Sequence, residues 1–504
     1  MISIALGEIA TSFIDVFSWP TLLYILAGIL LGIVLGAIPG IGPIIGIAVL
    51  LPLTASLDGV NVMIMFVTMY LGGLYGGSIS AILLNAPGTA GAAATTFDGY
   101  PMSRQGKAKN ALAISSVSSA IGGILSVGIL YLLVPVVTII VLSFGSPEYF
   151  LVALLGIAMI TVVAEGAMLK GLVAGSFGLL LTTIGIAPMT ANFRYPIHPL
   201  LYDGLSFIAV LIGLFALAEM FKLSGEGGSI AKDAEEAGLE GSIIEGVKTV
   251  LYNPITTLKS GFIGMAIGAI PGSGASVSNF VSYAEAMRSD DDSKSFGDGN
   301  PRGVIASEAS NSATCAGSLI PTLSFGIPGS GTTAVLLGAL LMHGIQPGPS
   351  LFSSDVGITY SFLAALVVGN LVILLLGVSL ITRFGVITKV NVNYIVPIII
   401  VVGLFGSLAL RINPIDVVTA MVFGILGYYF VKYDYSIIAL VLGVVLGPIA
   451  EDNLYRSLQI SDGSPMIFVS PSQPISLAIS ILIVILLLFP IVKPMVQRLS
   501  GWTN

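Results

Sequence analysis

Long apolar runs alternate with short polar breaks along almost the whole chain. Runs near the length that crosses a bilayer, about 20 residues, occur at 21–35, 60–74, 110–141, 149–163, 169–186 and 205–221. A second set occurs at 257–270, 313–325, 333–341, 358–381, 394–408, 417–429, 436–447 and 475–492. Several runs are short and lie beside Pro-Gly pairs, so we expect half-helices or re-entrant hairpins there. The pattern predicts an all-α polytopic membrane protein with roughly 10–14 membrane helices.

The breaks between these runs recur in two halves of the chain. The phrase GAIPGIG at Gly36–Gly42 returns as GAIPGSG at Gly268–Gly274, an offset of 271 − 39 = 232 residues. The phrase APGT at Ala86–Thr89 is echoed by IPGS at Ile327–Ser330, an offset of 328 − 87 = 241 residues. Proline removes a backbone donor and glycine favours non-helical dihedral angles, so each Pro-Gly pair predicts a broken helix. Corresponding breaks in two halves of a hydrophobic chain point to a transporter binding site.

These offsets predict two membrane repeats, residues 1–222 and 251–504, joined by a charged linker at 223–250. The stretch 222–248 contains six acidic and three basic residues together with several glycines. The loop at 104–109 is basic, whereas its counterpart at 285–302 is net acidic. Because basic loops stay on the cytoplasmic side, this asymmetry predicts repeats inserted in opposite senses.

Composition narrows the class of protein. The chain has 504 residues, of which 55% are hydrophobic and 9% charged, against about 25% charged residues in soluble domains. A net charge of −7 without a basic cluster argues against a nucleic-acid partner. One cysteine and two histidines are too few for a disulfide or for most zinc sites. We therefore expect no cofactor beyond a coupling ion, and no enzyme.

Small and hydroxyl-bearing residues surround the breaks in both halves. A half-helix that begins after Pro87-Gly88 would direct free N–H groups into the protein, where they attract an anion. The alternative is that small polar residues simply let membrane helices pack closely. The first interpretation predicts these substrate-binding residues: Ser78, Ser80, Asn85, Pro87, Gly88, Thr89, Thr95, Thr96, Asn311, Thr314, Ser318, Pro328, Gly329, Ser330 and Thr332.

The glycine turns also suit a coupling cation, because unwound carbonyls at such breaks ligate sodium in transporters. The candidates are Gly40, Gly42, Gly272, Ser273, Gly274, Ser276 and Asn279. Tight turns that need glycine are the alternative interpretation. Acidic residues are scarce near the breaks, and no chain of Asp, Glu and His crosses the helices as in proton relays. We therefore expect sodium coupling; if protons couple instead, their carriers are Asp98, Glu308 and His343.

Three longer phrases carry a resemblance to a known family. They are NAPGT at Asn85–Thr89, TFDGYP at Thr96–Pro101 and GIQPGP at Gly344–Pro349. With the stretches 75–108, 264–283 and 300–352, they make nearly the whole chain similar to the large membrane subunit of the tripartite tricarboxylate transporter family.

The resemblance implies a multi-pass secondary transporter of the bacterial inner membrane. It implies two partners, a small four-helix membrane subunit and a periplasmic solute-binding protein. It also implies uptake of di- and tricarboxylates, driven by an ion gradient through alternating access. An ion channel, or a carrier of other ions or solutes, is the alternative. Paired broken helices within one chain favour alternating access over a channel pore.

Overall fold

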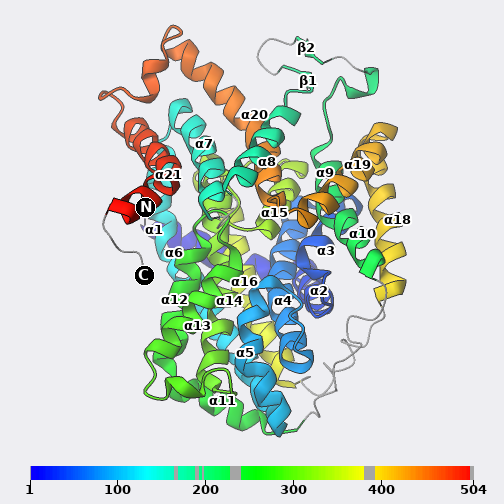
Figure 1. Ribbon diagram of the computed structural model, residues 1–504, viewed down its shortest axis with the longest axis vertical. Helices are drawn as coiled ribbons and strands as arrows, with labels where there is room; N and C mark the ends of the chain where they lie inside the picture. Colours follow the sequence, from blue (N-terminus) through cyan, green and yellow to red (C-terminus); the bar gives the residue numbers. More distant parts are fainter. Residues whose placement is uncertain are drawn as a thin grey trace.

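The computed structural model describes residues 2–163, 168–187, 192–195, 198–226, 240–379 and 392–499. Nearly all of this part is helical (Figure 1). The described strands, β1 (Gly185–Ile186) and β2 (Phe193–Arg194), pair antiparallel. Eight described helices are long and apolar enough to cross a membrane, and four shorter apolar helices accompany them. The predicted class, an all-α polytopic membrane protein, is confirmed.

The first half of the chain supplies ten of the labelled helices. They are α1 (Ile2–Val16), α2 (Trp19–Gly36), α3 (Gly42–Leu50), α4 (Gly59–Leu84), α5 (Ala93–Met102), α6 (Ala108–Leu142), α7 (Ser146–Val163), α8 (Met168–Leu181), α9 (Phe207–Leu211) and α10 (Ala218–Glu226). A π-helical turn, Ile212–Leu217, joins α9 to α10.

The second half of the chain supplies the other labelled helices. Its helices are α11 (Ile243–Tyr252), α12 (Pro254–Gly268), α13 (Gly274–Arg288), α14 (Pro301–Phe325), α15 (Gly331–Met342), α16 (Val356–Ser379), α18 (Val392–Arg411), α19 (Pro414–Lys432), α20 (Ile437–Ile460) and α21 (Pro474–Leu499). The pairs α2 and α12, α3 and α13, α4 and α14, and α5 and α15 meet the breaks at matching positions.

All four Pro-Gly phrases separate helices as predicted, and the first pair does so with the same backbone. Gly40 and Gly42 have φ angles of 84° and 60°, and Gly272 and Gly274 have φ angles of 78° and 61°. This left-handed region is open to glycine and costly for most other residues. The two glycine turns therefore have the same backbone conformation.

Packing within each half also repeats at the level of single atoms. A Cβ added to Gly76 of α4 would lie 2.3 Å from the carbonyl oxygen of Ile33 on α2. A Cβ added to Gly317 of α14 would lie 2.3 Å from the carbonyl oxygen of Met265 on α12. The two contacts are related by the offsets 317 − 76 = 241 and 265 − 33 = 232, those of the two phrases. Glycine is needed there so that the two helix backbones can touch.

Outer helices of the first half pack against outer helices of the second half. In the contact of α8 with α20, a Cβ on Gly178 would lie 2.2 Å from Leu440 O. In the contact of the π-helical turn with α19, a Cβ on Gly213 would lie 2.6 Å from Ala420 O. The inner helices do the same, because α6 packs on α14 and α16 packs on α4. Helices of each half therefore cover the packing faces of helices in the other half.

The orientation of matching helices agrees with the predicted inversion. In Figure 1, α5 lies in the lower part of the molecule and its counterpart α15 in the upper part. The inverted relation and the boundaries of the repeats stay predictions.

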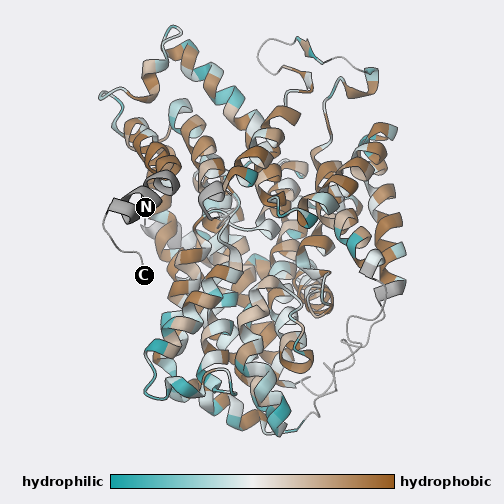
Figure 2. Ribbon diagram, viewed as in Figure 1, coloured by the Kyte–Doolittle hydropathy of each residue, from teal (hydrophilic) through white to brown (hydrophobic). Residues whose placement is uncertain are grey.

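Hydrophobic residues predominate along most of the helices (Figure 2). On α2, Leu23, Leu26, Leu30 and Val34 are each more than a third exposed, while the glycines of the opposite face pack on α4. Water does not tolerate such a stripe, but lipid does. Hydrophilic residues gather at the lower end of the molecule in this view.

Some predicted boundaries are wrong. The run 169–186 ends as a helix at Leu181, because the chain turns into β1 with Gly185 at φ 109°. The run 313–325 is too short, since α14 begins at Pro301. Helix α11 begins inside the predicted linker 223–250, of which residues 227–239 lie outside the described part.

Candidate functional site

The two repeats meet at a cavity of about 600 Å³ that all four breaks line. Helices α3, α13 and α15 begin at its wall, with Gly42, Gly274 and Gly331 among the lining residues. The short helical turn Ala90–Ala92, which leads into α5, begins there too. Unpaired N–H groups and the helix dipole make each of these ends attractive to an anion.

Eleven of the predicted residues line this cavity. They are Gly40, Gly42, Pro87, Gly88, Thr89, Gly272, Ser273, Gly274, Ser276, Ser330 and Thr332. The remaining predicted residues are not part of its lining: Ser78, Ser80, Asn85, Thr95, Thr96, Asn279, Asn311, Thr314, Ser318, Pro328 and Gly329. Whether any of them binds substrate or ion stays a prediction.

Ser330 connects the two repeats and caps a helix. Its Oγ lies 3.2 Å from the hydroxyl oxygen of Tyr70 on α4. It also accepts a hydrogen bond of 3.2 Å from Thr333 N, and Thr333 Oγ1 accepts one of 2.8 Å from Ser330 N. This reciprocal arrangement is a capping box, so the hydroxyl of Ser330 is already engaged at the start of α15.

Thr89, which the offset 330 − 89 = 241 matches to Ser330, differs in this respect. Its Oγ1 is buried and makes no hydrogen bond within the described part of the protein. A buried polar atom without a partner costs about 1–3 kcal/mol. Thr89 lines the cavity, but its unpaired hydroxyl lies against Gly77 of α4, where an added Cβ would be 2.5 Å away.

Two charged residues of the lining were missed by the sequence analysis. Glu219 and Lys222 lie one turn apart on α10, and Lys222 Nζ is 3.1 Å from Glu219 Oε1. The sequence places Lys222 at the edge of the linker, where a charge is expected to face solvent. Its spacing from Glu219 was the available signal, because residues three apart share one face of a helix.

The second glycine turn holds its polar side chains tightly. Ser273 Oγ donates to the carbonyl oxygens of Ile267 at 2.5 Å and Ile270 at 2.8 Å. Asn279 is fully buried on α13, and its Nδ2 donates to the carbonyl oxygen of Gly91. The oxygen-rich character that suggested a cation is present, with Ser273 and not Asn279 at the cavity.

Several predicted residues outside the lining bond to their own helices. Ser80, Thr96, Thr314 and Ser318 each donate to a carbonyl three or four residues earlier. Asn85 is exposed and ends α4 in the left-handed region, with φ 54°. These contacts agree with the alternative interpretation, close packing of membrane helices.

Asp98 holds a loop in place. Its Oδ1 accepts hydrogen bonds from the backbone N–H groups of Gly297, Gly299 and Asn300 at 2.8–2.9 Å. Its Oδ2 accepts one from the Tyr283 hydroxyl at 2.8 Å. These four bonds fix the approach to α14, so the geometry favours a structural role over proton transport.

His343 is another of the residues expected to carry protons if protons are the coupling ion. It follows α15 and does not line the cavity. Burial lowers the pKa of His343, against the opposing influence of nearby Asp58. The ring therefore favours its neutral form, as expected for a residue at a packed helix end.

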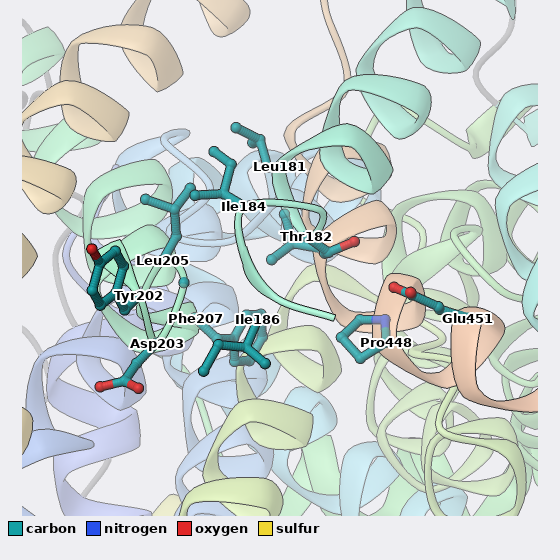
Figure 3. Close-up of a pocket in the computed structure, with 12 residues that line it drawn as sticks. Leu181, Thr182, Ile184, Ile186, Tyr202, Asp203, Leu205, Phe207, Pro448 and Glu451 are labelled. Atoms are coloured by element: carbon teal, nitrogen blue, oxygen red, sulfur yellow. The ribbon is translucent and has the colours of Figure 1, made fainter. Parts of the chain in front are cut away.

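A second cavity of about 340 Å³ lies beside the β1–β2 segment (Figure 3). Its wall is mostly apolar, with Asp203 and Glu451 as acids. Arg194 pairs with Glu451 at 3.0 Å. None of the predicted site residues belongs to it.

Broken helices from both halves of a membrane-spanning chain that converge on one cavity are typical of membrane transporters. A family model places the chain more narrowly, matching residues 22–442. The chain belongs to the tripartite tricarboxylate transporter TctA family. Membership makes it the large membrane subunit of a transporter that has further components, as the resemblance implied.

Two curated proteins of Agrobacterium vitis are similar to this chain. An uncharacterized 52.8 kDa protein in the TAR-I ttuC' 3' region is 32% identical over 451 residues, 89% of each chain. An uncharacterized protein in the TAR-II ttuC' 3' region is 32% identical over 231 residues, which are 46% of this chain and 96% of the relative. No solved structure matches the chain.

Proposed function

We propose that this subunit takes up small di- and tricarboxylates across the bacterial inner membrane by alternating access, driven by an ion gradient. Its proposed partners are a small four-helix membrane subunit and a periplasmic solute-binding protein. The observation that supports this best is the meeting of four broken helices, two from each repeat, at one cavity of about 600 Å³. Rocking of the repeats about such a shared site opens it to either side of a membrane in turn.

The chemistry of the wall suits a carboxylate. An anion that leaves water needs several hydrogen bonds in exchange, or its desolvation is prohibitive. Helix N-termini offer N–H groups and Lys222 offers a positive charge. Rotation of the Thr89 side chain would bring its unpaired hydroxyl to the cavity as well. The proposed site lies between 87–89 and 330–332, with Lys222 exchanging Glu219 for the substrate.

Sodium is the proposed coupling ion. The turns at 40–42 and 272–276 bring glycine carbonyls and serine hydroxyls to the same cavity, and hard oxygen ligands of this kind suit small cations. A cation at either turn would offset part of the charge of a neighbouring carboxylate.

Citrate uptake by the reconstituted three-component transporter tests the proposal. Lys222→Gln should weaken citrate affinity about tenfold to a hundredfold, since a hydrogen bond to a charged group contributes about 1.5–3 kcal/mol. Lys248→Gln on α11 is the matched control, because that lysine is exposed and lies outside the cavity lining. Equal affinity in the Lys222 variant and the wild type would place the substrate elsewhere. Uptake that persists without sodium would exclude sodium as the driving ion.

A further inference from the structure

One buried acid lies outside the cavity and is surrounded by hydroxyl groups. Glu308 on α14 is fully buried. Ser115 Oγ donates to its Oε2 at 2.9 Å, Ser119 Oγ donates to the same atom at 3.2 Å, and Thr95 Oγ1 donates to Oε1. The Ser78 hydroxyl also bonds to the carboxyl group. In the described part of the chain, no basic side chain forms an ion pair with it.

A carboxylate in this position needs a positive partner. Burying an uncompensated charge costs several kcal/mol, so buried acids are neutral or are paired with a cation. A hydroxyl donates to a carboxylate and, after rotation, accepts from a carboxylic acid. The cage around Glu308 therefore satisfies both the charged and the protonated form. Because the hydroxyl oxygens already lie in hydrogen-bond contact with the carboxyl group, a proton fits without displacing any heavy atom.

The corresponding place in the other repeat contains no polar side chain. Glu308 of α14 matches Val67 of α4 through the offset of 241 residues. The same offset matches Ser78 to Leu319 and Thr95 to Leu336.

The two serines of the cage are matched through α6 and α16. Gly122 on α6 lies against the backbone of Ala309. Gly369 on α16 lies against the side chains of Leu71, Ile29 and Thr68, of which Thr68 is the match of Ala309. The offset between these helices is therefore 369 − 122 = 247, which matches Ser115 to Phe362 and Ser119 to Leu366.

All five counterparts are apolar and at most 2% exposed. An apolar cluster is thus sufficient to pack this position of the fold, as its second copy demonstrates. An isosteric apolar replacement of a buried polar group is often neutral or stabilising, so stability gives no reason for the acid and its four hydroxyls. Their presence in one copy calls for a chemical role.

A short route connects this acid to the cavity. Asn311 lies one turn after Glu308 on α14, and its Oδ1 is buried without a hydrogen bond in the described part of the protein. A Cβ on Gly91 would lie 2.5 Å from that oxygen, and Gly91 lines the cavity. Thr95 lies one turn after Gly91 on α5. Asn311 therefore lies one helical turn from the caged carboxyl group and against Gly91 of the cavity wall.

Other titratable groups near α14 have their own partners. Tyr75 on α4 is the one that faces Glu308, and its hydroxyl bonds to Ser116. Several other groups on α14 and on the helices packed around it have partners of their own. Tyr70 bonds to Ser330, and Tyr131 donates to Tyr360 O. Asp98 pairs with Tyr283, Lys259 and Arg288 pair with Glu285, and Arg302 pairs with Asp290. Cys315 is buried on α14 itself.

We propose that Glu308 binds one proton from the cavity and releases it again in each transport cycle, past Asn311. The carboxylate and a proton from cavity water form the neutral acid, and the reverse step returns the proton to water. The inference rests on the proposed carboxylate transport, and it holds whichever ion occupies the glycine turns. On this proposal, the pH dependence of uptake comes from the side chain of Glu308.

The complete transporter in liposomes allows two transport measurements on Glu308→Gln, a neutral variant of the same volume. Citrate counterflow, which needs no net proton movement, should stay within about twofold of the wild type. Uptake driven by an imposed proton gradient should lose its response to that gradient. Glu245→Gln on α11 is the control, because this acid also accepts a hydrogen bond from a side chain, the amide of Asn110, but lies at the surface.

Infrared difference spectra provide a readout that does not depend on transport. The carbonyl band of a protonated carboxylic acid should change with pH in the wild type and be missing in Glu308→Gln. Glu308→Asp keeps a titratable group and should shift the pH midpoint of that band. An unshifted midpoint would overturn the inference even if the glutamine variant does not fold.

Three transport results would overturn the inference. They are a normal response of Glu308→Gln to the proton gradient, a loss of counterflow in correctly folded Glu308→Gln, and a defect confined to sodium dependence. Absence of counterflow in the wild type would instead refute the proposed function, and the infrared band would then decide the fate of the proton site by itself.

Discussion

The closest backbone approach at the cavity is made by Gly88, and replacing it tests the broken-helix design directly. A Cβ on Gly88 would lie 1.9 Å from the carbonyl oxygen of Gly36, 2.8 Å from Ser80 Oγ and 2.9 Å from Gly77 Cα. Real Cβ atoms essentially never come within 3.0 Å of another heavy atom. Gly88→Ala must therefore push the break away from α2 by about 1 Å.

The carbonyl of Gly36 cannot yield to the new methyl group. Gly36 ends α2, and a Cβ there would lie 2.1 Å from Gly73 O, so the two backbones already touch. Overpacking of this kind costs about 1–3 kcal/mol. If that cost falls on the substrate-binding conformation alone, citrate affinity drops about 5-fold to 150-fold.

Citrate binding and thermal melting of the purified protein measure these effects. Gly128→Ala on α6 is the matched control, since a Cβ there meets nothing within 4 Å and alanine favours a helix. The control should bind and melt like the wild type. Normal binding by Gly88→Ala, or an equal loss in both variants, would refute the argument that close backbone contact shapes the cavity.

Further substitutions separate binding from stability. Thr89→Val should weaken citrate affinity about tenfold without lowering the melting temperature, because its hydroxyl has no partner in the described protein. Ser330→Ala should weaken citrate affinity and should also lower the melting temperature, since a lost helix cap costs about 1 kcal/mol. Asp98→Ala should lower the melting temperature and leave citrate affinity unchanged, because three backbone N–H groups lose their acceptor outside the cavity. Calorimetry and equilibrium binding of citrate measure all three.

Each of these expectations has a contrary result. A Thr89→Val protein that melts early would mean that the hydroxyl bonds within the protein. A Ser330→Ala protein with unchanged melting would mean that the capping box contributes nothing. Reduced citrate affinity in well-folded Asp98→Ala would connect the loop before α14 to the substrate.

The paired breaks were predictable because Pro and Gly act on the backbone itself. Neither the proline at 87 nor the glycine at 88 needs a neighbour to interrupt a helix, and the repeated offset then pairs the two halves. The meeting of all four breaks at one cavity follows from that pairing. The charged residues that other helices bring to the cavity wall could not be predicted in this way. Lys222 reaches it only because α10 packs on the first glycine turn, where a Cβ on Gly40 would lie 3.1 Å from Leu223.

Hydropathy and residue type gave two kinds of wrong expectation for polar residues. The first turns of α14 contain Ser307, Glu308 and Ser310, which read as exposed, yet all three are fully buried. Neighbouring helices supply the hydrogen bonds of Glu308, from Thr95, Ser115 and Ser119, and a single sequence does not list those neighbours. Conversely, Thr314 and Ser318 resemble ligands by type, but each bonds to its own helix, an option open to every helical Ser or Thr.

The exchange of outer helices constrains how this chain is assembled. The glycine face of α8 is covered by α20, which is synthesised more than 250 residues later. During synthesis the first half must therefore wait in the membrane with that face against lipid. Two fragments cut between the halves would each lack a helix that the other holds, so they are expected to be unstable alone and to recover when produced together. The chain is in this sense a helix-swapped dimer of two similar units joined into one polypeptide.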